Sequence, residues 1–133
     1  TSTPRLVNVS ALKQIGAGET LTAGFVVGGS GSKTVLIRAI GPGLAQFGLP
    51  GTMPDPKLTL NQASVAAPIN ANNDWGGSAA TAAAFTSVGA FALTPSSKDA
   101  ALVVTLGPGN YTVQVAAADG TGGIALVEVY ELP

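Results

Sequence analysis

The side chains that could do chemistry in this chain of 133 residues include no histidine and no cysteine. Ser-His-Asp and Cys-His catalysis, His-ligated zinc and histidine acid–base chemistry are therefore excluded. Paired carboxylates could still hydrolyse a glycosidic bond, and the candidates outside the expected strands are Asp55, Asp74, Asp99 and Asp119. Each stands in a turn context, where an Asp commonly bonds its own backbone. We therefore expect that this protein is not an enzyme.

One loop concentrates the oxygen-bearing side chains that Ca²⁺ selects, in the sequence NANNDWGG from 70 to 77. The candidate ligands are Asn70, Asn72, Asn73, Asp74 and, from a separate loop, Asp55. Strong calcium sites recruit several carboxylates and this loop holds one, which favours a chain of Asx-turns instead. Trp75 is either core or a stacking platform for a sugar ring, and a lone Trp favours the core. We therefore expect the protein either to have no cofactor or to bind Ca²⁺.

Two charged residues stand inside β-prone runs. The period of two places Arg38 on the face of Leu36 and Ile40, and Glu128 on the face of Leu126. If both faces point inward, we expect Arg38 and Glu128 to form a structural ion pair with each other or with another charge, because an unpaired buried charge is costly. The alternative that both faces are solvated stays open.

The elements that must position these residues are short β-rich runs separated by Gly, Pro, Asn and Asp, a pattern typical of a β-sandwich or barrel. We expect strands at 5–10, 20–27, 33–40, 57–61, 101–106, 111–117 and 124–131. Glycine-rich connections at 28–32, 107–110 and 119–123 predict hairpins. The run SAATAAAF at 78–85 predicts one short alanine-rich helix that covers an end of the sandwich. The expected fold class is all-β, a two-sheet β-sandwich forming a single domain over residues 1–133.

The composition indicates an unusually uncharged exterior. Charged residues make up 10% of the chain, against about 25% in typical soluble domains. The net charge of -1 gives little like-charge repulsion between copies, which favours self-association. The basic residues are scattered without a cluster, which excludes nucleic acid as a main partner. No apolar run approaches the roughly 18 residues that a transmembrane segment requires.

The second half of the chain resembles a known family. In order, DPKLTL, NANNDWGG, KDAALVVTLGPGNYTVQV and GGIALVEVYEL are similar to the bacterial pre-peptidase C-terminal domain, a jelly-roll β-sandwich attached to secreted enzymes. The matching positions are Asp55, Leu58, Asn73, Asp74, Leu106, Gly109, Tyr111 and Gly122. The alanine-rich insert departs from that pattern, and the first half looks more like a repeated module of very large bacterial surface proteins. The resemblance implies a jelly roll of about seven to nine strands, secretion, calcium at Asn72, Asn73 and Asp74, and no catalysis.

Two functions are compatible with these features. The first is a non-enzymatic extracellular structural subunit or repeat module that self-assembles into a fibre or matrix at the bacterial cell surface. Its partners are copies of itself, and residues 1–12 form an arm that a neighbour could exchange, with Leu6, Val7 and Val9 as candidate assembly residues. The alternative is a calcium-assisted accessory domain of a secreted protein, which binds glycans or proteins through the loop around Asp74.

Overall fold

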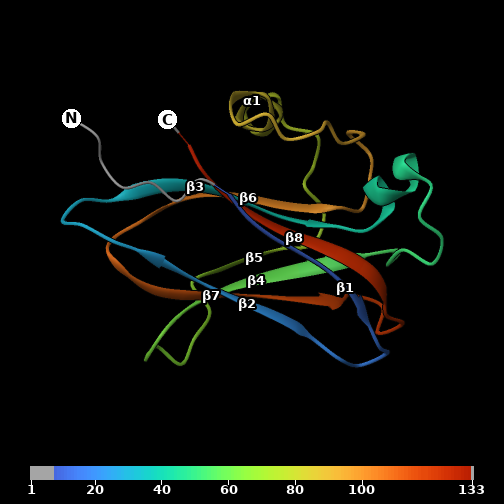
Figure 1. The fold of residues 1–133 in the computed structure, drawn as a ribbon, viewed down its shortest axis with the longest axis horizontal. Coiled ribbons are helices and arrows are strands. Elements are labelled where there is room, and N and C mark those ends of the chain that lie inside the picture. The colour runs from blue at the N-terminus through green and yellow to red at the C-terminus, as the bar shows by residue number, and fades with distance from the viewer. Residues whose placement is uncertain (1–7, 133) are drawn as a thin grey trace.

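The fold consists of two four-stranded antiparallel sheets packed face to face (Figure 1), in a computed structural model that describes residues 8–132. The first sheet has the order β1 (Asn8–Ile15), β8 (Gly123–Glu131), β3 (Lys33–Ile40), β6 (Ala100–Leu106). The second has the order β2 (Leu21–Val27), β7 (Gly109–Ala117), β4 (Pro56–Gln62), β5 (Asn70–Asn72). Eight strands in the orders 1-8-3-6 and 2-7-4-5 make a jelly roll. The predicted all-β, jelly-roll-like sandwich is confirmed.

The main core lies between the two sheets, where alternate side chains of each strand point inward. In β7 the alternation is clear, because Tyr111, Val113 and Val115 are buried while Gln114 between them is exposed. In β3 the alternation is lost, and every residue from Val35 to Ile40 is buried. A strand that is buried on both faces must be covered on its outer side as well. The first sheet is therefore the middle layer of three.

The third layer is a cover segment, residues 73–99, which contains α1 (Ala79–Ser87). Figure 1 shows α1 lying over β3 and β6. The helix begins where the Ser78 hydroxyl accepts the backbone N–H of Thr81, at 3.4 Å, and Phe85 is its buried residue. A second apolar cluster fills the space beneath it: Leu36, Ile40, Leu44, Trp75, Phe85, Leu93, Ala101 and Tyr130. The expected short helix is present, but it covers a sheet face rather than an end of the sandwich.

The three predicted hairpins are wrong. Residues 28–32 join β2 to β3, residues 107 and 108 join β6 to β7, and residues 118–122 join β7 to β8. In each case the chain passes from one sheet to the other, so the flanking strands do not pair with each other. Glycine-rich turns serve both kinds of connection, and the pairing is set by partners distant in sequence, as between β1 and β8.

Two strands depart from the sequence prediction by more than two residues. The first strand was expected at residues 5–10, of which 5–7 lie outside the described residues, and β1 continues to Ile15 because its pairing with β8 extends to Gly123. Residues 70–72 were expected to be loop, but they form β5, because their backbone pairs with β4.

The long connection after β3 contains a 3-10 helix, η1 (Pro42–Phe47). Among residues 8–132, no helix is long and apolar enough to cross a membrane.

Candidate functional site

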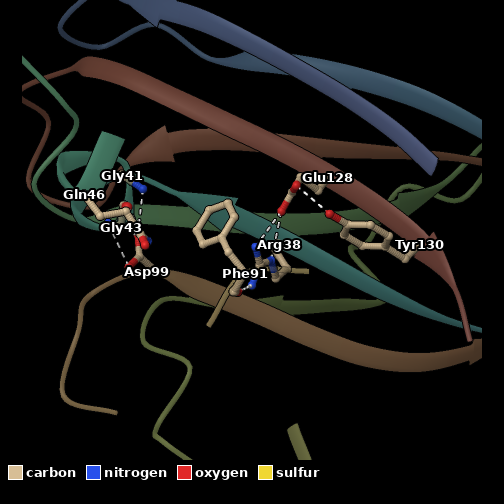
Figure 2. Close-up of polar contacts among 8 residues, drawn as sticks. All are labelled: Arg38, Gly41, Gly43, Gln46, Phe91, Asp99, Glu128 and Tyr130. Carbon is tan, nitrogen blue, oxygen red and sulfur yellow. Dashed lines mark hydrogen bonds and ion pairs between the residues drawn. The ribbon is translucent and has the colours of Figure 1, made fainter. Parts of the chain in front are cut away.

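The most elaborate polar arrangement is an ion pair beneath the cover segment. Arg38 of β3 lies directly opposite Glu128 of β8 in the sheet register. The Arg38 Nε–H donates to Glu128 Oε1 at 2.9 Å, and Nη2 lies 2.8 Å from the same oxygen (Figure 2). Both residues are buried, with 0% and 6% of their surface exposed. The structure thus brings the two residues together, on the outer face of the first sheet rather than in the core between the sheets.

The cover segment completes the surroundings of the Arg38 guanidinium. Nη1 donates to the backbone carbonyl of Phe91 at 2.7 Å, as Figure 2 shows. The guanidinium carbon lies 4.7 Å from the ring centroid of Phe85 and 4.5 Å from that of Phe91. Cation–π contacts of a desolvated guanidinium contribute about 2 kcal/mol each. Arg38 therefore ties the cover segment to the first sheet.

Tyr130 binds the other oxygen of the carboxylate. Its hydroxyl donates to Glu128 Oε2 at 2.6 Å. Burial, the hydrogen bond to Glu128 and the charge of that carboxylate raise the pKa of Tyr130 to about 12, against a smaller lowering by Arg38. The phenol therefore stays a donor at physiological pH. Every charged group of this network is engaged within the protein, so its geometry is that of a structural ion pair.

Asp99 holds the corner between β3 and η1. It is fully buried, and its Oδ1 accepts the backbone N–H of Gly41 at 2.7 Å (Figure 2). Both of its oxygens lie 3.1 Å from the N–H of Gly43, and Oδ2 also accepts the hydroxyl of Ser97 at 2.8 Å. A cavity of about 340 Å³ lies beside these groups, between η1 and residues 92–99. Because the carboxylate already accepts hydrogen bonds from Gly41, Gly43 and Ser97, the geometry favours a structural role for Asp99 over an acid–base role.

The candidate calcium ligands are distributed over several elements. The Asn70 side-chain oxygen accepts the N–H of Ala71 at 2.8 Å, and the Asn72 oxygen accepts the N–H of Ala101 at 3.1 Å. Asn73 is exposed. The first bond is local to β5, and the second uses the Asn72 amide oxygen to hold β5 against β6. Among residues 8–132, no three His, Cys, Asp or Glu side chains lie close enough to hold a metal ion.

Asp55 is nevertheless close enough to Asp74 and Asp119 to feel their charges. Its Oδ1 is buried and has no hydrogen-bond partner. Burial is the largest cause that raises the pKa of Asp55, followed by the charge of Asp74, while Lys98 lowers it and Asp119 raises it further. Asp55 thus lies within electrostatic range of two carboxylates and one lysine that come from separate loops. Calcium binding here stays a prediction, and its test is given in the Discussion.

Trp75 lies in the apolar cluster under the cover segment. Its ring is 7% exposed and packs on Phe85 at 5.0 Å between centroids. The indole N–H donates to the carbonyl of Thr94 at 3.0 Å. This position agrees with the core alternative, and the buried ring offers no free face on which a sugar could stack.

The candidate assembly residues are only partly described. Leu6 and Val7 lie outside the described residues. Val9 pairs with Val129 in the register of β1 and β8, so residues 8–12 of the arm complete this chain's own sheet. Sequence reasoning missed the exposed apolar side chains elsewhere, because a strand or loop pattern does not say which apolar residues are left uncovered. They are Leu12, Val26, Phe47, Val65, Ile69 and Val103, each between 41% and 62% exposed.

Comparisons with known proteins relate the chain to other β-sandwiches. No family model matches it, and a search of curated proteins found no match. The pre-peptidase C-terminal domain of a collagenase from Bacillus anthracis is similar over 97% of this chain and 99% of that domain, with a TM-score of 0.56 and 14% identity. A family 35 carbohydrate-binding module from Clostridium thermocellum is similar over 93% of this chain and 90% of that module, with a TM-score of 0.38 and 14% identity. The collagenase domain confirms the fold that the sequence resemblance predicted.

Proposed function

We propose that this chain is a non-catalytic extracellular module that associates with copies of itself, or with neighbouring repeats of a longer protein, in a bacterial surface fibre or matrix. The observation that carries the proposal is the set of exposed apolar side chains on an almost uncharged exterior. Residues 39–54, 58–73 and 75–97 contain no charged side chain at all. When another molecule covers apolar side chains in such surroundings, few charged groups nearby have to give up their water.

The interior of the molecule supports a structural role. The buried Arg38–Glu128 pair and the buried Asp99 are bonded within the protein, as described above. The cavity beside Asp99 is lined by that carboxylate and by the Ser97 hydroxyl, and the two are bonded to each other at 2.8 Å, which supports a structural role for both. The fold shared with a pre-peptidase C-terminal domain, a type of domain attached to secreted enzymes, supports a place outside the cell.

Sedimentation equilibrium of the wild-type protein tests this proposal. Its average mass should rise from that of a monomer at low micromolar concentration to that of open-ended assemblies at about 1 mM, the effective concentration that a short linker creates between repeats. Electron micrographs of the concentrated sample should show filaments or a network. A monomer that persists at about 1 mM would rule the proposal out.

A neutral glycan is a second candidate partner, favoured by the outer face of the second sheet. Cross-strand neighbours Thr22, Gln114 and Thr59 form one row on that face, and Thr112 and Asn61 lie in the next. These side chains are exposed or half-buried, and Asn61 donates to Gln114 at 3.4 Å. Amide and hydroxyl groups offer both donors and acceptors to the hydroxyls of an uncharged sugar chain.

A glycan array discriminates this candidate from self-association. Binding of a neutral glycan should be lost in Gln114→Ala and kept in Ala83→Lys, a matched change on the exposed side of α1. If calcium assists, as the loop around Asp74 predicts, a chelator and Asp74→Ala should each weaken the binding. If the wild type binds no glycan on the array, the glycan candidate is contradicted and self-association alone remains supported.

A further inference from the structure

We infer that copies of this chain associate head to tail, with the β4–β5 loop of one copy packed on the η1 surface of the next; this rests on the proposed self-association. Two apolar patches carry the inference. The loop patch consists of Val65 and Ile69 in the β4–β5 loop with Val26 of β2. The η1 patch consists of Phe47 with Phe91 beside it.

The loop patch projects from one end of the second sheet. All residues from 63 to 69 are exposed, with Val65 at 48% and Ile69 at 41%. The backbone of Ala63 donates to the Asn110 carbonyl, and Asn110 is the register partner of Val26, which is 62% exposed. The loop base is therefore fixed to β7, and the patch is presented by a supported loop.

The η1 patch lies on the other side of the middle layer. The Phe47 ring is 57% exposed and meets the ring of Phe91 edge to face at 5.0 Å. Phe91 in turn stacks on the Arg38 guanidinium at 4.5 Å. Phe47 is thus held at the surface by a chain of contacts that ends in the buried ion pair. A side chain that is already ordered loses less conformational entropy when a partner covers it.

The two patches are at opposite ends of the molecule. Figure 1 shows the β4–β5 loop at the lower left and the short teal helix η1 at the upper right of the long axis. The strand β4 separates the two patches along the chain. The segment that follows η1 ends at Pro56, where β4 begins, and the β4–β5 loop starts after Gln62, where β4 ends. A strand of that length spans roughly 20 Å. One copy therefore cannot bring its own two patches together.

This placement decides the kind of contact. Two different patches at opposite ends make a heterologous contact, which propagates into an open filament unless its rotation closes a ring. The segments that carry the patches are 20–32, 39–54, 58–73 and 75–97. None of them has a charged side chain, so neither patch contains a charge that must be desolvated. A contact made by one loop and one helical turn is at the small end of protein interfaces. We therefore expect weak binding in dilute solution, which linkage of repeats or high concentration strengthens.

Complementation of two blocked variants tests the head-to-tail contact. Val65→Glu removes the loop patch and Phe47→Glu removes the η1 patch, and each leaves the other patch intact. At the concentration where the wild type assembles, each variant alone should sediment as a monomer, and an equimolar mixture should stop at a dimer. Ala83→Glu on the exposed side of α1 is the matched control and should assemble as the wild type does. Thermal melting of each variant checks that it is folded.

Cross-linking gives a second readout, since the natural chain has no cysteine. A bis-maleimide should join Val65→Cys to Phe47→Cys in a mixture and should produce a ladder of oligomers from the double variant. Efficient dimers from either single variant would show a two-fold contact and overturn the inference. Assembly that survives Val65→Glu or Phe47→Glu, or that is abolished by deletion of residues 1–7, would also overturn it while leaving self-association intact. A wild type that stays monomeric would instead remove the proposed function.

Discussion

At the scale of single residues, the fold keeps the ion pair of Arg38 and Glu128 out of water. An isolated guanidinium at the position of Arg38 would be strongly unfavourable, because the low-dielectric interior does not replace its hydration. Glu128 supplies the opposite charge, the Phe91 carbonyl accepts a further hydrogen bond, and two aromatic rings cover the flat faces. The cover segment supplies both the carbonyl and the rings. Removal of the charge should therefore affect the attachment of that segment as well as the sheet.

We predict that Arg38→Met lowers the free energy of unfolding by about 3 to 5 kcal/mol, because it leaves the Glu128 carboxylate buried without its cation. Arg38→Met combined with Glu128→Gln should be more stable than Arg38→Met alone, since the buried charge is then gone and Tyr130 keeps an acceptor. Urea unfolding of the wild type, both single variants and the double variant measures the coupling. A loss below about 1 kcal/mol in Arg38→Met would mean that the pair behaves like an exposed one.

Asp55 should make the folded protein less stable as the pH rises, which is the opposite of the usual effect of a carboxyl group. Burial first, and then the charges of Asp74 and Asp119, raise its pKa above the ordinary value of 3.8, against the lowering by Lys98. The folded state then holds this proton more tightly than the unfolded state, so the contribution of Asp55 to stability is lost as the pH rises through its folded pKa. Asp55→Asn should therefore raise the melting temperature at pH 7, and the difference should vanish once the pH falls below 3.8.

The same variant tests the predicted calcium site. If Ca²⁺ binds between Asp55 and Asp74, millimolar Ca²⁺ should raise the melting temperature of the wild type and have no effect on Asp55→Asn. Equal effects of Ca²⁺ on both proteins would place any bound ion elsewhere. A melting temperature of the wild type that does not respond to Ca²⁺ would contradict calcium binding under those conditions.

At the scale of elements, the corner between β3 and η1 is built on a close backbone approach. A Cβ added to Gly41 would overlap the carbonyl oxygen of Met53. Met53 cannot easily retreat, because its N–H donates to the Ile124 carbonyl at 2.8 Å and its side chain is fully buried. Asp99 fixes the other side of the corner through the N–H groups of Gly41 and Gly43.

Gly41→Ala should therefore destabilise the protein by about 3 kcal/mol, the cost of forcing extra volume into a packed site. Gly28→Ala is the matched control, since nothing lies within 4 Å of its added Cβ, and it should be neutral or slightly stabilising. Thermal unfolding of the two variants gives the comparison. Similar melting temperatures for both would show that the corner can shift.

The strands could be predicted from the sequence because alternation and β-branched residues are local signals. The same alternation placed Arg38 and Glu128 as candidates for pairing. It could not show that α1 covers the outer face of the first sheet, so the pair was expected either inside the sandwich or in water. Asp99 was recognised only as a turn residue, because its backbone partners at Gly41 and Gly43 lie more than fifty positions away in the sequence. Connections between sheets depend on such distant contacts.

At the scale of the whole molecule, the two outer surfaces differ. The cover segment buries the outer side of the first sheet, whereas the outer side of the second sheet keeps exposed Thr and Gln side chains. Composition predicted an exterior with few charges, and the exposed apolar residues agree with it. Their distribution between the two ends depends on the jelly-roll path of the chain and could not be inferred from composition.

Association through such a surface should respond to solution conditions as apolar contacts do. Salt screens exposed charges over about 10 Å at 0.1 M, so a contact without charges should not weaken as NaCl is raised, and sulfate should strengthen it. Cooling should weaken it, because the hydrophobic driving force falls at low temperature. Sedimentation of the concentrated wild type across salt concentration and temperature measures both effects. Dissociation at high NaCl would instead indicate contacts through the exposed charges, such as Lys57 and Asp119, because screening acts on those groups first.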